Sequence, residues 1–344
     1  MPALILTGDT LSVRLVSQSL EVLQRFNDGS DTDRIDSVKV PLIEIERVVI
    51  VGQPGITLPV LARLMDRSIP VFFVTRRGRW RGSLLPDRNL NAGRRITQYQ
   101  RASDEAYCLQ VAKKLVNAKI RNSRRVLQRL AANRGLSAEA TQIKTCNELQ
   151  LLGQQAKRAE SLNLLRGYEG AAAAAYFERL RAYFTDEIPF MKRSRRPPRD
   201  PANALLSFAY TVLLSEMEGA VRSHGLDAAI GCLHADRHNS PSLALDLIEP
   251  LRPALADLLV MNIVSHKMVK PELDFEIRPS NEGTYLSASG RKTFFGCYEQ
   301  ALTRTFRVKK DAPRTTLRQV LDQQVTGYLR MLEKDEDFDF FQLP

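Results

Sequence analysis

The chain has 344 residues, which is enough for one large domain or two ordinary ones. Its 50 Lys and Arg residues against 39 Asp and Glu give a net charge of +11, so a polyanionic partner is favoured over an acidic protein surface. The four cysteines lie far apart without a CxxC pair, which argues against a zinc ribbon or a disulfide framework and fits a reducing compartment. The N-terminus lacks a secretory signal pattern, and no apolar run reaches membrane-spanning length. We therefore expect a cytoplasmic protein without a membrane partner.

The first ninety residues have the pattern of a β domain. Runs rich in β-branched residues predict strands over 4–6, 10–16, 38–42, 46–51 and 69–75, and the three- and four-residue spacing of apolar side chains predicts a helix over 55–66. No Gly-rich phosphate loop is present in this part. We expect a β-sandwich-like domain over residues 1–90 with one short helix.

The remainder of the chain has a helical period. Polar and turn residues cluster over 86–95, which predicts a boundary there. We expect a linker over 91–103, a larger all-α domain over 104–332, and an acidic, mobile tail over 333–344. The predicted fold class is α+β.

A long helix is predicted over 106–133, with an apolar stripe on one side. Its basic side chains are expected on the opposite face: Lys113, Lys114, Lys119, Arg121, Arg124, Arg125 and Arg129. A face of a single sign is unusual, because soluble helices normally mix charges for pairing. Two interpretations stay open for this face, a solvated surface and a phosphate contact.

A second helix is predicted over 163–184, where an alanine run favours helix and close packing. Glu169 lies near its start, on the stripe expected to face the core. A carboxylate in the first turn can complement the helix dipole. It can equally serve as a ligand, and the local sequence leaves both roles open.

The segment 191–200 reads MKRSRRPPRD and predicts an extended, strongly basic loop. It is the best candidate in the chain for contact with a phosphate backbone, although a solvated linker is the alternative. Its basic residues are Lys192, Arg193, Arg195, Arg196 and Arg199. Asp200 then caps a core helix that has Pro201 at its first position and ends before Gly225.

The segment from Gly231 to Pro253 gathers the side chains best suited to chemistry. His234 lies in a polar stretch, and Asp246 and Glu249 follow three residues apart, on one face of a predicted helix. An imidazole with two carboxylates can bind a divalent metal that acts on phosphodiesters. A surface histidine followed by a capped amphipathic helix is the alternative. Pro250 predicts that this helix is broken or kinked there.

Helices are also predicted over 254–268, 289–306 and 315–331, and the second of these carries Arg291, a further candidate for DNA contact.

Three motifs occur together: RG-x-EG over 166–170, RPPRDPANALLSFAYTVL over 196–213, and GCLHADRHNSPSLALDLIEPLRP over 231–253. In this order the chain closely resembles the Cas-one family, the CRISPR-associated integrases of the adaptation step, over nearly its whole length. The resemblance implies a metal-dependent DNA endonuclease and integrase. Such an enzyme inserts short foreign DNA fragments into a CRISPR array by attack of a 3′-hydroxyl on a phosphodiester.

The resemblance also implies the ligands. The family's metal-binding Glu, His and acidic residue match Glu169, His234 and Glu249, while Asp246 matches a further acidic position, as a ligand or as a support for one. His238 competes with His234, which we prefer because it directly follows the apolar segment 230–233. Carboxylates with one imidazole suit Mg²⁺ or Mn²⁺.

The family works on double-stranded and branched DNA as a homodimer, with the β domain as the expected dimer surface and a small second adaptation protein bridging two dimers. Two other hypotheses remain. One is a catalytically weak DNA-binding scaffold of the same complex, and the other is an unrelated basic RNA-binding protein, against which the lack of an RNP-type aromatic motif counts.

Overall fold

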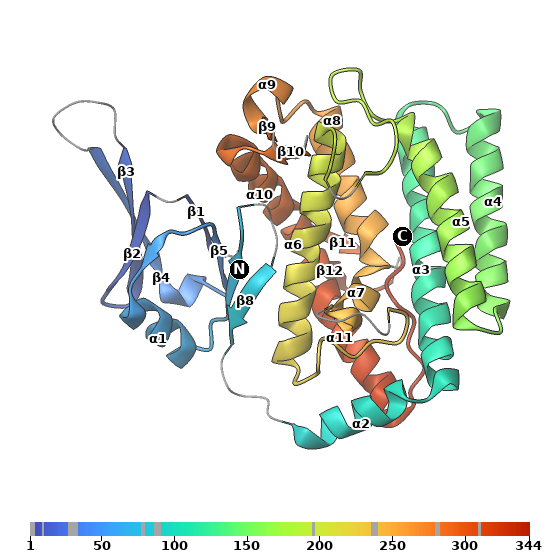
Figure 1. The fold of residues 1–344 in the computed structure, drawn as a ribbon, viewed down its shortest axis with the longest axis horizontal. Helices are drawn as coiled ribbons and strands as arrows, with labels where there is room; N and C mark the ends of the chain where they lie inside the picture. The colour runs from blue at the N-terminus through green and yellow to red at the C-terminus, as the bar shows by residue number, and fades with distance from the viewer. Residues whose placement is uncertain are drawn as a thin grey trace.

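The computed structural model describes residues 4–8, 10–26, 34–76, 80–85, 91–194, 197–234, 240–278, 283–308 and 311–344. Among these, a β-rich N-terminal part lies beside a larger, mainly helical part (Figure 1). The expected α+β class is confirmed.

Two four-stranded sheets form the described N-terminal part. The first has the order β1 (Leu4–Thr7), β5 (Val48–Val51), β7 (Val71–Val74) and β8 (Trp80–Leu84), and only β8 runs antiparallel to its neighbour. The second has the order β4 (Arg34–Pro41), β3 (Ser19–Phe26), β2 (Leu11–Val16) and β6 (Gly55–Ile56). Helix α1 (Leu58–Asp66) and the short 3₁₀ helix η1 (Leu42–Glu44) complete this part. Strands β3, β6 and β8 were not predicted, and β6 occupies the first two residues of the predicted helix 55–66.

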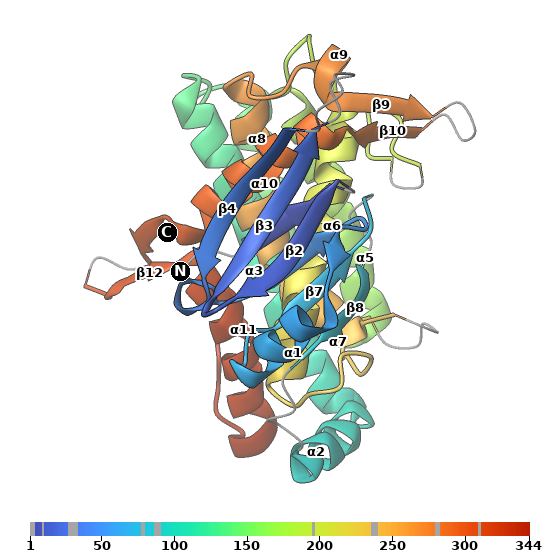
Figure 2. The same cartoon turned by 90° about the vertical axis from the view of Figure 1, so that its left-hand side faces the viewer.

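The first sheet is buried on both faces. Val48 and Ile50 of β5 point into a core shared with the second sheet, whereas Val49 and Val51 point into the helical core. This double burial explains why β5 is a continuous apolar run instead of an alternating one. Figure 2 shows β2, β3 and β4 on the side away from the helices.

The helical part is built from helices of very different length. They are α2 (Ala92–Ala102), α3 (Glu105–Asn133), α4 (Ala140–Arg158), α5 (Leu162–Arg181), α6 (Pro201–Ser223), α7 (Ser242–Ile248), the π-helix η2 (Arg252–Asp257), α8 (Leu258–Ser265), α9 (Pro271–Asp274), α10 (Ala288–Thr303) and α11 (Leu317–Lys334). Two small hairpins pair β9 (Phe275–Arg278) with β10 (Gly283–Leu286), and β11 (Thr305–Arg307) with β12 (Arg314–Thr316).

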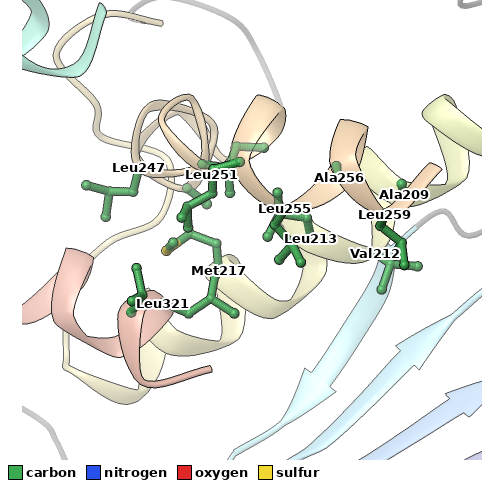
Figure 3. Close-up of a cluster of buried hydrophobic side chains, with 14 of the residues drawn as sticks. Ala209, Val212, Leu213, Met217, Leu247, Leu251, Leu255, Ala256, Leu259 and Leu321 are labelled. Atoms are coloured by element: carbon green, nitrogen blue, oxygen red, sulfur yellow. The ribbon is translucent and has the colours of Figure 1, made fainter. Parts of the chain in front are cut away.

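Helix α6 is the centre of the helical core. Its residues Val212, Leu213 and Met217 pack with side chains from α7, η2 and α8 and with Leu321 of α11 (Figure 3). By length and composition alone α6 could cross a membrane, but 72% of its apolar window is buried inside the protein, as in a core helix. The predicted cap is confirmed, because the Asp200 side chain accepts a hydrogen bond from the Asn203 amide at 2.7 Å.

The segment expected to be a linker, 91–103, is instead mostly helix α2 and belongs to the helical part. Gln98 is fully buried, and its side-chain amide donates to the carbonyls of Asp227 and Ile230 at 2.9 and 3.0 Å. The Asp227 amide donates back to Gln98 at 2.9 Å. Polar side chains that made this segment resemble a linker are therefore its docking contacts.

The tail is also not a mobile end in this structure. Phe340 is 1% exposed, and Asn122 of α3 hydrogen bonds both the Phe341 carbonyl, at 2.9 Å, and the Leu343 amide, at 2.8 Å. Figure 1 shows the C-terminus beside α3. The acidic composition concealed the aromatic residues that hold this segment to the core.

Candidate active site

A buried carboxylate fixes the position of His234. Both oxygens of Asp246, which is fully buried on α7, accept hydrogen bonds: Oδ2 from the amides of Cys232 and Leu233 at 2.6 and 2.9 Å, and Oδ1 from the His234 amide at 3.0 Å. Oδ1 also lies 2.7 Å from His234 Nδ1. Because a carboxylate only accepts, Nδ1 carries the proton in this contact and Nε2 stays open as a donor of electrons.

Gly231 makes this arrangement possible. A Cβ atom at this position would lie 2.7 Å from Asp246 Oδ2 and 2.8 Å from the Ser242 carbonyl carbon. Only glycine therefore lets the backbone of the 231–234 segment approach the carboxylate of α7 closely enough to donate to it.

The RG-x-EG motif of α5 meets the same segment. The Arg166 guanidinium donates to the Leu233 carbonyl from Nη2 at 2.7 Å and from Nε at 3.3 Å. Glu169 lies one turn further along α5, and its side chain is 19% exposed. Through Arg166 the motif thus connects α5 to the residue before His234, while Glu169 faces α7.

Three basic side chains lie close to the Glu249 carboxylate. It is 1% exposed and caps α7, which ends just before Pro250 as the proline predicted. Lys119 Nζ lies 2.6 Å from Oε2, Arg252 Nε lies 3.1 Å from Oε1, and His234 Nε2 lies 3.8 Å from Oε1. Burial is the largest single influence and raises the pKa of Glu249, but Arg252, Lys119 and His234 together outweigh it and lower that pKa to about 2.

Lys119 joins the two glutamates. Its ammonium contacts Glu169 Oε1 as well as Glu249, so it bridges α5 and α7 from α3. Burial opposes its charge, but both carboxylates favour it, and the pKa of Lys119 is raised. We assigned Lys119 to the basic outer face, and that assignment is wrong. The missed signal is its spacing, since Leu115 and Ser123, four residues away on either side, are both buried.

A second polar cluster lies behind the metal-ligand candidates. Tyr176 and Tyr210 donate to Asp257 at 2.9 and 2.5 Å, and the Tyr210 ring contacts the guanidinium groups of Arg193 and Arg252, at 5.3 and 5.1 Å from its centroid. Burial raises the pKa of Asp257 to about 6. Arg193 belongs to the basic loop and Arg252 contacts Glu249, so one tyrosine ring joins the loop to the site.

Within the ranges that the structure describes, no group of three or more His, Cys, Asp or Glu side chains is arranged to hold a metal ion. The donor chemistry nevertheless fits Mg²⁺ or Mn²⁺, since two carboxylates and an imidazole nitrogen face one another. The positive charge between the carboxylates is the Lys119 ammonium. His234 has the carboxylate support on Nδ1 that metal-binding histidines commonly have. His238 lies outside the described residues.

The residues predicted to contact DNA lie in different surroundings in the structure. Lys192 and Arg199 are exposed, while Arg195 and Arg196 lie outside the described residues. Three others have contacts within the protein: Arg193 Nη1 donates to Asn203 at 2.7 Å, Arg124 Nε to the Cys146 carbonyl at 3.1 Å, and Arg125 Nε to the Pro344 carbonyl at 2.8 Å.

Arg291 does not fit the prediction of a surface contact. It is buried on α10, and Nη1 donates to the Leu286 carbonyl at 2.7 Å. Its position on the inner side of α10 was not apparent from the charge of that helix.

Comparison with known proteins identifies the family. The family model "CRISPR associated protein Cas1" matches residues 4–300. The chain is 36% identical to "CRISPR-associated endonuclease Cas1 3" of Thermus thermophilus, across 69% of this chain and 68% of that relative. A chain of the structure "Cas6-RT-Cas1--Cas2 complex" aligns with 99% of this chain and 36% of its own length, with 28% identity and a TM-score of 0.76. "Casposase bound to integration product" shares the fold, with 24% identity, a TM-score of 0.82, and coverage of 99% of this chain and 93% of that one. The chain belongs to the Cas1 family of CRISPR-associated endonucleases.

Proposed function

We propose that this Cas1 protein is the integrase of CRISPR adaptation, with Glu169, His234 and Glu249 as its metal ligands. The observation that carries the proposal is their convergence from three separate segments. Glu169 of α5 and Glu249 of α7 contact the same ammonium, and His234 Nε2 faces Glu249. A helical core gains nothing from a buried carboxylate such as Glu249 beside a second, half-buried one, because removing carboxylates from water costs desolvation energy.

A bound Mg²⁺ or Mn²⁺ would polarise the scissile phosphate and stabilise the charge that develops there. The protein's own residues prepare the ligands. Asp246 orients His234, and Arg252 with Lys119 keeps Glu249 ionised. The nucleophile comes from the substrate, as a DNA 3′-hydroxyl in integration or as water in cleavage, so no protein nucleophile is required.

Double-stranded and branched DNA is the proposed substrate, held by the basic loop before α6. Lys192 and Arg199 are exposed there, and Arg193 anchors the loop to the Tyr210 ring, which also contacts Arg252 of the site. DNA bound to the loop is thereby brought toward Glu249. The net charge of +11 favours this binding, and we expect it to weaken as salt rises.

We further propose a homodimer formed through the β domain. Ile35 and Val38 on β4 are 52% and 61% exposed, and β4 is the edge strand of its sheet. An edge strand with exposed apolar side chains invites pairing with a second copy. The similar structure "Cas6-RT-Cas1--Cas2 complex" contains Cas2, and we propose that a small second adaptation protein bridges two dimers of this chain in the cytoplasm.

Strand transfer tests the function. Purified protein is incubated with Mn²⁺, a fragment with free 3′-hydroxyl ends and a leader-repeat duplex, with and without the partner protein. Glu169→Ala, His234→Ala and Glu249→Ala should each abolish joining while circular dichroism and DNA binding persist. Joining by these variants at the rate of the unchanged protein would contradict the ligand assignment, whereas no joining by the unchanged protein would favour a scaffold role.

A further inference from the structure

Lys119 lies apart from the other basic residues of α3. Its side chain is 17% exposed, and its ammonium contacts one oxygen of Glu169 and lies 2.6 Å from one oxygen of Glu249. These two carboxylates come from different helices, α5 and α7, and Lys119 comes from a third. Its position between them is therefore a tertiary arrangement rather than a pairing along one helix.

The position has an electrostatic consequence. Two ionised carboxylates that face each other in a buried site repel strongly unless a cation lies between them. An ammonium and a divalent cation both meet that requirement, and both would draw on the carboxylates of Glu169 and Glu249. They therefore compete for one place.

We propose that Lys119 is a positioning residue that holds Glu169 and Glu249 together in the metal-free protein, and that a divalent metal binds by displacing its ammonium. This inference rests on the proposed ligand set.

The structure leaves room for the displaced group. A cavity of about 40 Å³ adjoins the site, lined by Lys119, Glu169, Tyr210 and Asp257 among others. A space of roughly 10–15 Å³ is enough for one water molecule, so the cavity can accept an ammonium without unfolding of α3. Asp257 supplies a carboxylate on its wall.

The test is Mn²⁺ affinity, measured by titration calorimetry on the full-length protein after metal removal. Lys119→Met removes the competing cation, so we expect the dissociation constant to fall roughly tenfold. The metal-free variant should also melt at a lower temperature than the unchanged protein and gain more from Mn²⁺. Lys144→Met makes the same chemical change at an exposed position of α4 and should leave both measurements unchanged.

Lys119→Gln serves as a second variant, because it is neutral but keeps a hydrogen-bond donor, and it should also bind Mn²⁺ more tightly. Equal or weaker affinity in folded variants would overturn the inference. Glu249→Gln separates this failure from failure of the ligand set. If the unchanged protein binds no Mn²⁺, or Glu249→Gln binds it equally well, the ligand assignment itself is wrong.

Discussion

The substitution Asp246→Asn tests whether Asp246 positions His234 or binds the metal directly. In the structure the two oxygens of Asp246 accept from three backbone amides and lie close to one imidazole nitrogen, at 2.6 to 3.0 Å. A carboxylate with these commitments supports His234 rather than binding a metal directly. The substitution preserves shape and removes one acceptor atom.

The expected loss of unfolding free energy follows from the contacts of Asp246. Asparagine presents one oxygen, so whichever way its amide turns, two of the four donors face an NH₂ group. If the NH₂ group replaces Oδ2, the amides of Cys232 and Leu233 are left without a partner in a fully buried site. Each unsatisfied buried donor costs about 1–3 kcal/mol, so the variant should lose about 2–6 kcal/mol of unfolding free energy.

Urea unfolding of the metal-free protein measures this loss, and Asp186→Asn, at an exposed position, is the control and should change stability by less than about 0.5 kcal/mol. Mn²⁺ affinity should fall roughly 10–100-fold, because a disordered imidazole binds metal less well. A variant as stable as the unchanged protein would refute the reasoning. If it had also lost Mn²⁺ binding, Asp246 would be a ligand.

Four further substitutions test the packing of the site, the packing of the tail and the charge beside the site. Gly231→Ala places a Cβ 2.7 Å from Asp246 Oδ2 and should cost about 1–3 kcal/mol in thermal unfolding. Gly296→Ala, where no atom lies within 4 Å, should instead gain up to about 1 kcal/mol. Phe340→Ala should lower the unfolding free energy by about 3–5 kcal/mol, whereas a mobile tail would leave it unchanged. Asp257 has a pKa raised from 3.8 to about 6 by burial, so its contribution to stability is complete below pH 3.8 and is lost as the pH rises through 6. The loss amounts to about 3 kcal/mol. The unfolding free energy of Asp257→Asn relative to the unchanged protein should rise by that amount between pH 3.8 and 7, and a constant difference would contradict the assignment.

Local signals in the sequence predicted the parts of the fold that depend on local physics. The cap at Asp200 begins α6, Gly225 follows its end, and Pro250 separates α7 from η2. Helix α4 was missed, and α2 resembled a linker because its polar residues, such as Gln98, hydrogen bond loop carbonyls that lie about 130 residues further along the chain. Such contacts are set by tertiary packing, which no local pattern contains.

The motifs identified the candidate site, and the geometry adds that Asp246 and Glu249 have different surroundings there. Spacing alone left Asp246 and Glu249 as two carboxylates on one face. The structure distinguishes them by their partners, because Asp246 meets backbone donors and Glu249 meets cations. Both residues are acidic and lie on the same predicted face, so only the surroundings could separate their roles.

Lys119 shows what the spacing of buried residues along a helix can reveal. Ala112, Leu115 and Ser123 are buried on α3, and Lys119 lies on the same stripe, seven residues after Ala112 and four residues from each of Leu115 and Ser123. A cation on a buried stripe requires an anion from another element, because an unpaired buried charge is too costly to retain. In this chain the anions are Glu169 and Glu249, the two carboxylates that the motifs select. The partly buried Lys119 therefore points to the same site as the motifs, on independent physical grounds.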